Sequence, residues 1–98
     1  MNLTTEKNGT ELTVRLSGEL NTLTAPELSA LLDQELGGVQ SLILDFKECD
    51  YVSSAGLRVL LATFKQMKAA NGSMSLDNVG VNFRDVLENT GLDAVFGI

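Results

Sequence analysis

Two adjacent serines, Ser53 and Ser54, lie where a hydroxyl group could take part in chemistry. They follow an almost wholly apolar run, Ser41–Phe46, and they precede a segment with helical periodicity, Leu57–Ala70. This order predicts a buried strand, a short loop and a helix that begins at the serines. The unpaired N–H groups and the positive dipole end of a first helical turn favour the negative charge of a phosphoserine. The pattern therefore predicts a phosphorylation switch, or a serine that only caps the helix, and the two roles are compatible.

Composition narrows the class of protein. The 98 residues include 13 acidic and 7 basic side chains, which gives a net charge of −6, and 44% of the residues are hydrophobic. This balance predicts one globular domain over residues 1–98 and disfavours binding to nucleic acid or to an anionic membrane. The chain contains no histidine, which excludes Ser-His-Asp and Cys-His catalysis and imidazole metal ligands. We therefore expect a protein that is not an enzyme and needs no cofactor or metal.

Neither a signal peptide nor a membrane span is expected. Residues 1–6 lack a basic region followed by an apolar stretch, and no apolar run approaches the roughly 18 residues that cross a bilayer. These features predict a cytoplasmic protein.

Cys49 is the only cysteine, so no disulfide can form within the chain, and a packing or loop role is expected. Asp45, Glu48 and Asp50 are expected to be solvated loop carboxylates, because no further ligands occur at a metal-binding spacing.

The first third of the chain predicts a hairpin followed by a helix. Asn8-Gly9 indicates a type I′ turn between strands at 3–7 and 11–16. Thr24 and Glu27 form a capping-box pattern, with Pro26 in the first turn. Leu23 and Leu28 fit a hydrophobic staple. The expected apolar stripe of this helix, which ends at Gly37-Gly38, consists of Leu28, Leu31, Leu32 and Leu36.

The remaining chain predicts two more strands and two more helices. The run 41–46 is apolar at positions that would face both sides of a sheet, as expected of a central strand. The helix after the serines should bury Leu60 and Phe64 against the sheet and expose Arg58 and Lys65. A strand at 73–77 and a helix around 83–90 follow, and the apolar tail 95–98 is expected to add a short edge strand.

The order β-β-α-β-α-β-α predicts the α/β class. We expect a single-layer mixed sheet of four to five strands with amphipathic helices packed on it, because helical crossovers join parallel strands. Sites in such sheets form beyond the carboxyl ends of strands. The loop 21–24 and the serines 53–54 both occupy that position, so the two loops should converge on one rim.

The chain resembles a STAS-domain anti-sigma factor antagonist of the bacterial type over nearly its whole length. The residues that carry the resemblance are Gly18-Glu19-Leu20-Asn21 with Thr24-Ala25, the strand 42–46, the run Tyr51-Val52-Ser53-Ser54-Ala55-Gly56-Leu57, and Thr90-Gly91-Leu92. In the family pattern the serine two residues before the glycine is phosphorylated, which corresponds to Ser54. Ser53 and Asn21 stand where the family often has aspartate, so two negative charges are missing.

The resemblance implies a protein–protein switch. Such a protein, when unphosphorylated, binds an anti-sigma factor that is also a serine kinase, and so releases the sigma factor. Phosphorylation ends the binding, and a serine phosphatase reverses it. On this basis we expect a monomer without nucleic-acid or membrane partners, and a partner-binding surface made of Asn21, Thr22, Ser53, Ser54, Ala55, Gly56 and Arg58.

Other roles remain open at the level of sequence. STAS-like domains also serve as interaction subunits of transporters or stress-signalling complexes, in which the serine need not be phosphorylated. A catalytic serine finds little support without histidine. An acyl-carrier role conflicts with the predicted hairpin and the strand at 42–46, because those carriers resemble all-helical bundles.

Overall fold

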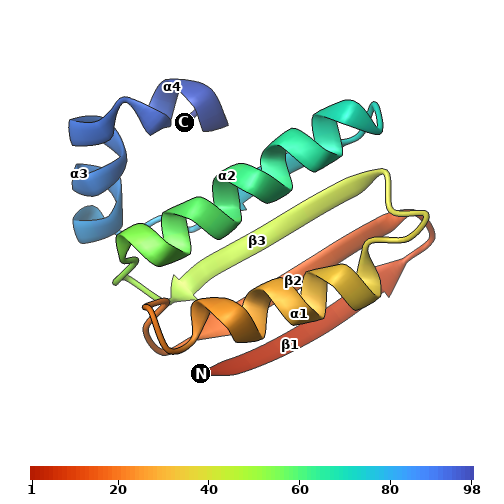
Figure 1. The fold of residues 1–98 in the computed structure, drawn as a ribbon, viewed down its shortest axis with the longest axis horizontal. Coiled ribbons are helices and arrows are strands. Elements are labelled where there is room, and N and C mark those ends of the chain that lie inside the picture. The colour runs from red at the N-terminus through yellow and green to blue at the C-terminus, as the bar shows by residue number, and fades with distance from the viewer.

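Strands and helices alternate along the chain in the computed structural model, which describes residues 1–98 (Figure 1). The elements are β1 (Asn2–Asn8), β2 (Glu11–Ser17), α1 (Ala25–Glu35), β3 (Ser41–Glu48), α2 (Ser54–Ala69), β4 (Ser73–Asp77), α3 (Val81–Thr90) and α4 (Leu92–Phe96). The expected α/β class and mixed sheet are confirmed, with four strands. None of the helices combines the length and the apolar character that crossing a membrane requires.

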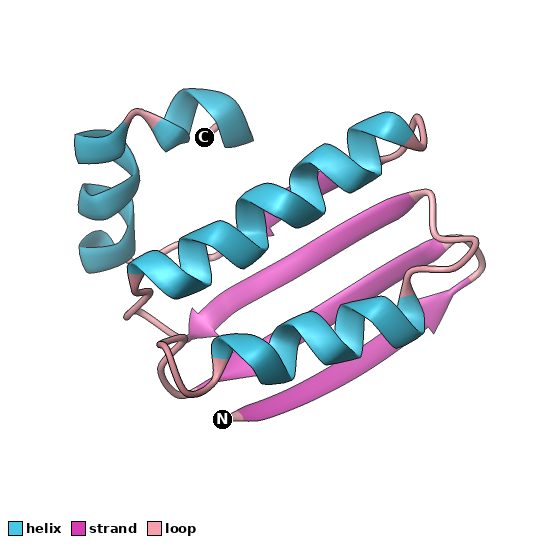
Figure 2. Ribbon diagram, viewed as in Figure 1, coloured by secondary structure: helices cyan, strands magenta, loops and turns pink.

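The sheet has the strand order β1-β2-β3-β4. β1 pairs antiparallel with β2, while β2–β3 and β3–β4 are parallel pairs. The chain crosses from β2 to β3 through α1 and from β3 to β4 through α2, each time in the same direction across the sheet. Crossovers of one hand therefore place both helices on the same face, and Figure 2 shows α1 and α2 side by side in front of the strands.

The core lies between this face and the helices. In β3 the residues Leu42, Leu44 and Phe46 are buried, whereas Ile43 between them is only half-buried. β3 is an interior strand with apolar residues on both faces, as predicted, but only one of these faces is buried. The physical reason is that no helix covers the second face of the sheet. Buried and less buried residues therefore alternate along β3, as in a sheet with one solvated face.

The polar face of the sheet is held by side-chain contacts between strands. Arg15 lies 3.2 Å from the Glu6 carboxylate and 4.0 Å from that of Asp45. The Asp45 carboxylate also accepts hydrogen bonds from the Asn78 side chain and from the backbone N–H of Lys47. These donors, Asn78 first, hold the pKa of Asp45 below its usual value. Asp45 is thus a cross-strand linker rather than a solvated loop carboxylate.

The hairpin turn is shifted by one residue from the predicted position. Asn8 pairs with Glu11, so Gly9 and Thr10 form the centre of the turn. Only Gly9 has a positive φ, at 64°, and it occupies the first central position. A type I′ turn needs a positive φ at both central positions, whereas a type II′ turn needs it only at the first, which is the position of Gly9 here.

Two predicted features at the start of α1 are absent. Thr24 is the N-cap residue but makes no side-chain capping bond; its hydroxyl donates to the Glu19 carbonyl oxygen at 2.6 Å instead. The expected capping box is therefore wrong. The hydrophobic staple is also wrong, because Leu23 is 83% exposed and turned away from the helix core. Pro26 does lie in the first turn, as predicted.

The tail forms the short helix α4 rather than the expected edge strand. Gly91, with φ 76°, ends α3 and starts α4. The helix folds back so that the Phe96 ring meets the Phe64 ring edge-on at 5.5 Å between centroids. Phe64 is consequently half-buried against α4, not buried against the sheet. Leu60 is fully buried as predicted, and the buried positions of α2 are Gly56, Leu60, Thr63 and Met67.

The two faces of α2 should respond differently to truncation. Leu60 has no exposed surface, so we expect Leu60→Ala to lower the free energy of unfolding by about 2–5 kcal/mol. Lys65 is exposed and makes no ion pair, so Lys65→Ala should change it by less than about 0.5 kcal/mol. Urea denaturation of both variants measures the difference. Equal, small effects would show that the buried face of α2 is assigned incorrectly.

Candidate functional site

The loops that follow β2 and β3 are joined by backbone hydrogen bonds. The N–H of Leu20 donates to the Tyr51 carbonyl at 3.0 Å, and the N–H of Ser53 donates to the Leu20 carbonyl at 2.8 Å. Leu20 and Val52 thus form an isolated parallel bridge beyond the strand ends. The predicted convergence of the two loops on one rim is confirmed. The rim lies at the carboxyl edge of the parallel strands, at the left of Figure 1.

Gly56 allows α2 to start directly on this bridge. A Cβ at residue 56 would lie 2.8 Å from Leu20 Cγ and 3.0 Å from Val52 Cγ1. Only a glycine therefore lets the first turn of the helix pack this closely. Gly56 is buried, so its role in this geometry is to position the serines.

The two serines have different environments. Ser53 is the N-cap residue of α2, and its Oγ accepts a hydrogen bond from the Gly56 N–H at 3.4 Å. Ser54 is the first residue of the helix, is exposed, and its hydroxyl makes no hydrogen bond within the chain. The capping role predicted for one serine or the other thus belongs to Ser53, and the Ser54 hydroxyl is free to react.

The loop after β2 is organised by Asn21. Its Oδ1 accepts hydrogen bonds from the backbone N–H groups of Leu23 and Thr24, at 3.0 and 3.1 Å, and from the Thr24 hydroxyl at 3.2 Å. The Asn21 oxygen is therefore used inside the loop, while Thr22 is exposed at its tip. Aspartate would supply the same acceptor, so the amide preserves the loop and removes one negative charge from the rim.

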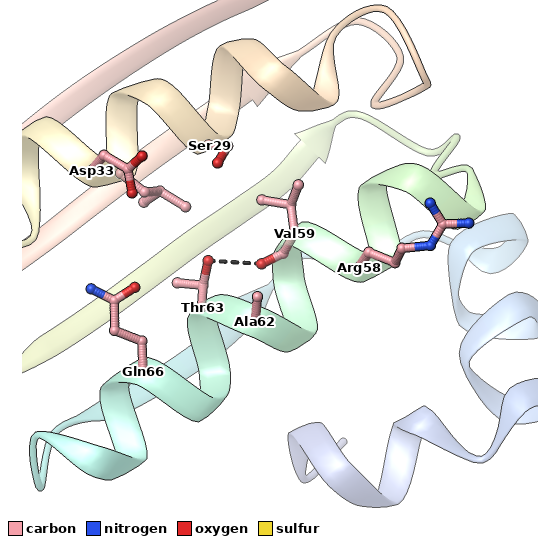
Figure 3. Close-up of a pocket in the computed structure, with 8 residues that line it drawn as sticks. Ser29, Asp33, Arg58, Val59, Ala62, Thr63 and Gln66 are labelled. Carbon is pink, nitrogen blue, oxygen red and sulfur yellow. Dashed lines mark hydrogen bonds between the residues drawn. The ribbon is translucent and has the colours of Figure 1, made fainter.

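Arg58 lies one turn after Ser54 and is exposed. Figure 3 shows its side chain running back along α2 toward the first turn, away from Ser29 and Asp33. Helical side chains lean toward the N-terminus, which explains this direction. Ala55, between the serines and Gly56, is half-buried.

A cleft of about 240 Å³ separates α1 from α2 in the same view. Its walls include Ser29, Asp33 and Gln66, and the Thr63 hydroxyl on its floor donates to the Val59 carbonyl oxygen at 2.7 Å. Of the predicted site residues only Arg58 reaches it. The cleft is therefore separate from the serine rim.

Asp50 links the rim to α3, which the sequence did not suggest. Its carboxylate accepts hydrogen bonds from the Asn82 side chain at 2.8 Å and from the Phe83 N–H at 3.3 Å. α3 starts at Gly80, which has no side chain to cap the helix, so Asp50 supplies the missing acceptor from another loop. Asp50 is an exposed loop carboxylate, as predicted, and the cap of α3 is an additional role. A Cβ at residue 80 would collide with the Asp50 carboxylate, so the glycine makes room for this cap.

Cys49 is a buried packing residue, as predicted. It has 1% exposure, and its thiol donates to the Tyr51 carbonyl oxygen at 3.6 Å. Burial raises the pKa of the thiol above its usual value. The thiol therefore stays protonated at neutral pH and is a poor nucleophile.

Comparison with known proteins identifies the family of this chain. The family model of the STAS domain matches residues 2–98, so the chain belongs to the STAS domain family. A Bordetella bronchiseptica protein named as an anti-sigma factor antagonist, BtrV, is 34% identical over 100% of this chain and 85% of its own length. The anti-sigma-B factor antagonist of Bacillus subtilis is 29% identical over 100% of this chain and 90% of its own length.

Solved structures show the same fold. The anti-sigma factor antagonist SpoIIAA in its unphosphorylated form superposes with a TM-score of 0.75 at 23% identity, covering 99% of this chain and 100% of that one. An anti-sigma factor antagonist from Mycobacterium paratuberculosis superposes with a TM-score of 0.81 at 26% identity, covering 97% of this chain and 81% of that one. The chain thus shares its overall fold with these proteins.

The link between Asp50 and α3 can be tested by truncation. We expect Asp50→Ala to lower the free energy of unfolding by about 0.5–2 kcal/mol, because it removes the cap of α3. Amide hydrogen exchange should become faster in the first turn of α3 than elsewhere. Glu48→Ala is the matched control, because the exposed Glu48 side chain makes no such bond. Unchanged exchange in α3 would contradict the capping role.

Proposed function

We propose that this chain is an anti-sigma factor antagonist that is switched by phosphorylation of Ser54. When unphosphorylated it binds an anti-sigma factor in the cytoplasm and releases the sigma factor. That anti-sigma factor is also the serine kinase that modifies Ser54, and a separate serine phosphatase restores the binding-competent form. The proposal is supported by membership of the STAS family and by relatives named as anti-sigma factor antagonists.

The observation that carries the proposal is the free hydroxyl of Ser54. It is exposed on the first turn of a helix whose cap is already provided by Ser53. The Leu20–Val52 bridge and the packing of Gly56 fix this turn. A kinase therefore meets a hydroxyl held in one place, as positioning for phosphoryl transfer requires.

The chemistry of transfer belongs to the partner. The Ser54 oxygen attacks the γ-phosphorus of ATP, the bond to the ADP leaving group breaks, and a base of the kinase takes the hydroxyl proton. This chain supplies no base for that proton, since it has no histidine and the carboxylate of Asp50 is bonded to α3. The chain is thus the substrate and the binding partner of the kinase, not an enzyme.

The rim can accept the phosphate without unfolding. At Ser54 the group brings about 1.5–2 negative charges to a helix N-terminus, which favours anions. Arg58 extends toward the same turn. Ser53 and Asn21 replace acidic residues of the family pattern while keeping their acceptor roles, so no carboxylate of either residue repels the phosphate. We therefore infer that phosphorylation acts at the interface, by charge, bulk and desolvation.

Phosphorylation should be specific for Ser54. Incubation with the cognate kinase, ATP and magnesium is expected to add one phosphate, which peptide mass spectrometry locates. Ser54→Ala should abolish the reaction because the acceptor is lost. Ser53→Ala is the matched control; it removes a cap worth about 0.5–2 kcal/mol and should slow the reaction without preventing it. Phosphate on Ser53, or none on the wild-type chain, would overturn the assignment, and the latter result would favour an interaction subunit that is not switched by phosphorylation.

The phosphate should weaken binding to the anti-sigma factor by about a hundredfold or more, because a charge is desolvated there without a matching partner. Ser54→Asp should reproduce part of this loss, and Ser54→Ala should still bind. Isothermal titration calorimetry of the unmodified chain, the phosphorylated chain and the two variants gives the four dissociation constants. Equal affinity of the phosphorylated and unmodified chains would show that Ser54 is only part of the helix terminus and not a switch.

A further inference from the structure

Large exposed apolar side chains gather at the serine rim. Four such residues occur in the protein: Leu23 at 83%, Tyr51 at 53%, Val81 at 75% and Val95 at 41% exposure. Leu23 lies after β2, Tyr51 lies after β3, and Val81 lies after β4 at the start of α3. Each of the three parallel strands thus ends in a segment that presents one apolar side chain at the same edge of the sheet. Only Val95, on α4, lies elsewhere.

Hydrogen bonds join these three segments at the edge of the sheet where α2 begins. The Tyr51 carbonyl is bonded to the Leu20 N–H, which joins the loop of Tyr51 to that of Leu23. The neighbouring Asp50 is bonded to Asn82 and Phe83, which joins the same loop to the start of α3 and so to Val81. We call Leu23, Tyr51 and Val81 the apolar rim. Single exposed apolar residues are common on proteins, but three gathered on one edge indicate a binding surface.

A protein that binds at Ser54 through an interface of ordinary size must also contact the apolar rim. A specific protein complex buries about 800 Å² on each partner, which is about one seventh of the 5344 Å² surface of this chain. One serine supplies only a small part of that area. A kinase that reaches the Ser54 hydroxyl must therefore cover the neighbouring loops as well.

We propose that the apolar rim is the anchoring surface for the anti-sigma factor kinase, which meets it with an apolar patch of its own. Tyr51 lies in the central loop of the three and is the main anchor, in keeping with the enrichment of tyrosine among the residues that dominate binding energy. Leu23 and Val81 flank it and exclude water. The footprint thus extends from the two loops of the serine site to α3. This inference rests on the proposed function and adds the residues that give the partner its affinity.

The test compares alanine substitutions on and off the rim. Leu23→Ala, Tyr51→Ala and Val81→Ala are titrated calorimetrically against the purified kinase that phosphorylates the wild-type chain. Tyr51→Ala should weaken binding roughly tenfold or more, and each flanking change roughly threefold or more. The matched control, Val95→Ala, truncates an exposed apolar residue on α4 and should bind like wild type. All four changes fall on exposed side chains, and urea denaturation confirms that each variant is folded.

Kinetics and chemical protection provide independent measurements. The KM of the kinase for the chain should rise in the rim variants while kcat stays unchanged, because the lost contacts bind without taking part in the reaction. Tyr51 is the only tyrosine in the chain. Its nitration by tetranitromethane, followed by mass spectrometry, should therefore slow when the kinase is bound.

The outcomes separate this inference from the proposed function. If the kinase binds and phosphorylates the wild-type chain but the rim variants keep their affinity, the apolar rim is not the anchor and the proposed function stands. If Tyr51→Ala abolishes self-association of the chain while leaving kinase binding unchanged, the surface belongs to a second copy and the inference fails. If no such kinase acts on the wild-type chain, the proposed function fails and this inference fails with it.

Discussion

The parallel bridge between Leu20 and Val52 is the contact on which the site depends. It continues the pairing of β2 with β3 past the ends of both strands, through the bonds of Leu20 with Tyr51 and of Ser53 with Leu20. Gly56 then packs on the same two side chains, so the first turn of α2 rests directly on the bridge. The position of the Ser54 hydroxyl is thus fixed by the backbone bonds between two loops and by the absence of a side chain at Gly56 of α2.

The two adjacent serines have separate roles that a single residue would perform poorly. Ser53 satisfies the Gly56 N–H and starts the helix, while Ser54 remains exposed and unbonded. A hydroxyl engaged as a cap is less available to a kinase, and loss of the cap on phosphorylation would loosen the helix. In the proposed switch the cap and the acceptor are separate residues, so the phosphate can be added and removed while α2 keeps its start. This separation suits a switch that acts at its surface rather than by refolding.

The sheet carries helices on one face, and this arrangement determines which surfaces remain for partners. Crossovers of the same hand place α1 and α2 together and leave the second face polar, with Arg15, Glu6 and Asp45 in contact on it. Exposed large apolar side chains are consequently concentrated at the carboxyl edge of the sheet, where loops follow three parallel strands. Asp50 adds α3 to that edge by capping it from the loop that leads to the serines. Hydrogen bonds therefore connect the segments along this edge.

The sequence by itself determined most elements, because hydrophobic periodicity and turn residues act locally: the four strands, the three longer helices and the meeting of two loops at Ser53 and Ser54 were predicted correctly. It could not determine which groups pair across the fold. The Thr24 hydroxyl donates to the Glu19 carbonyl oxygen rather than capping its own helix. The Asp50 carboxylate accepts hydrogen bonds from α3, across the rim. The tail became a helix because Phe96 could pack on Phe64, a contact that depends on where α2 lies. The division of roles between the two serines was likewise decided only by tertiary structure, since the helix begins where Gly56 packs on Leu20 and Val52.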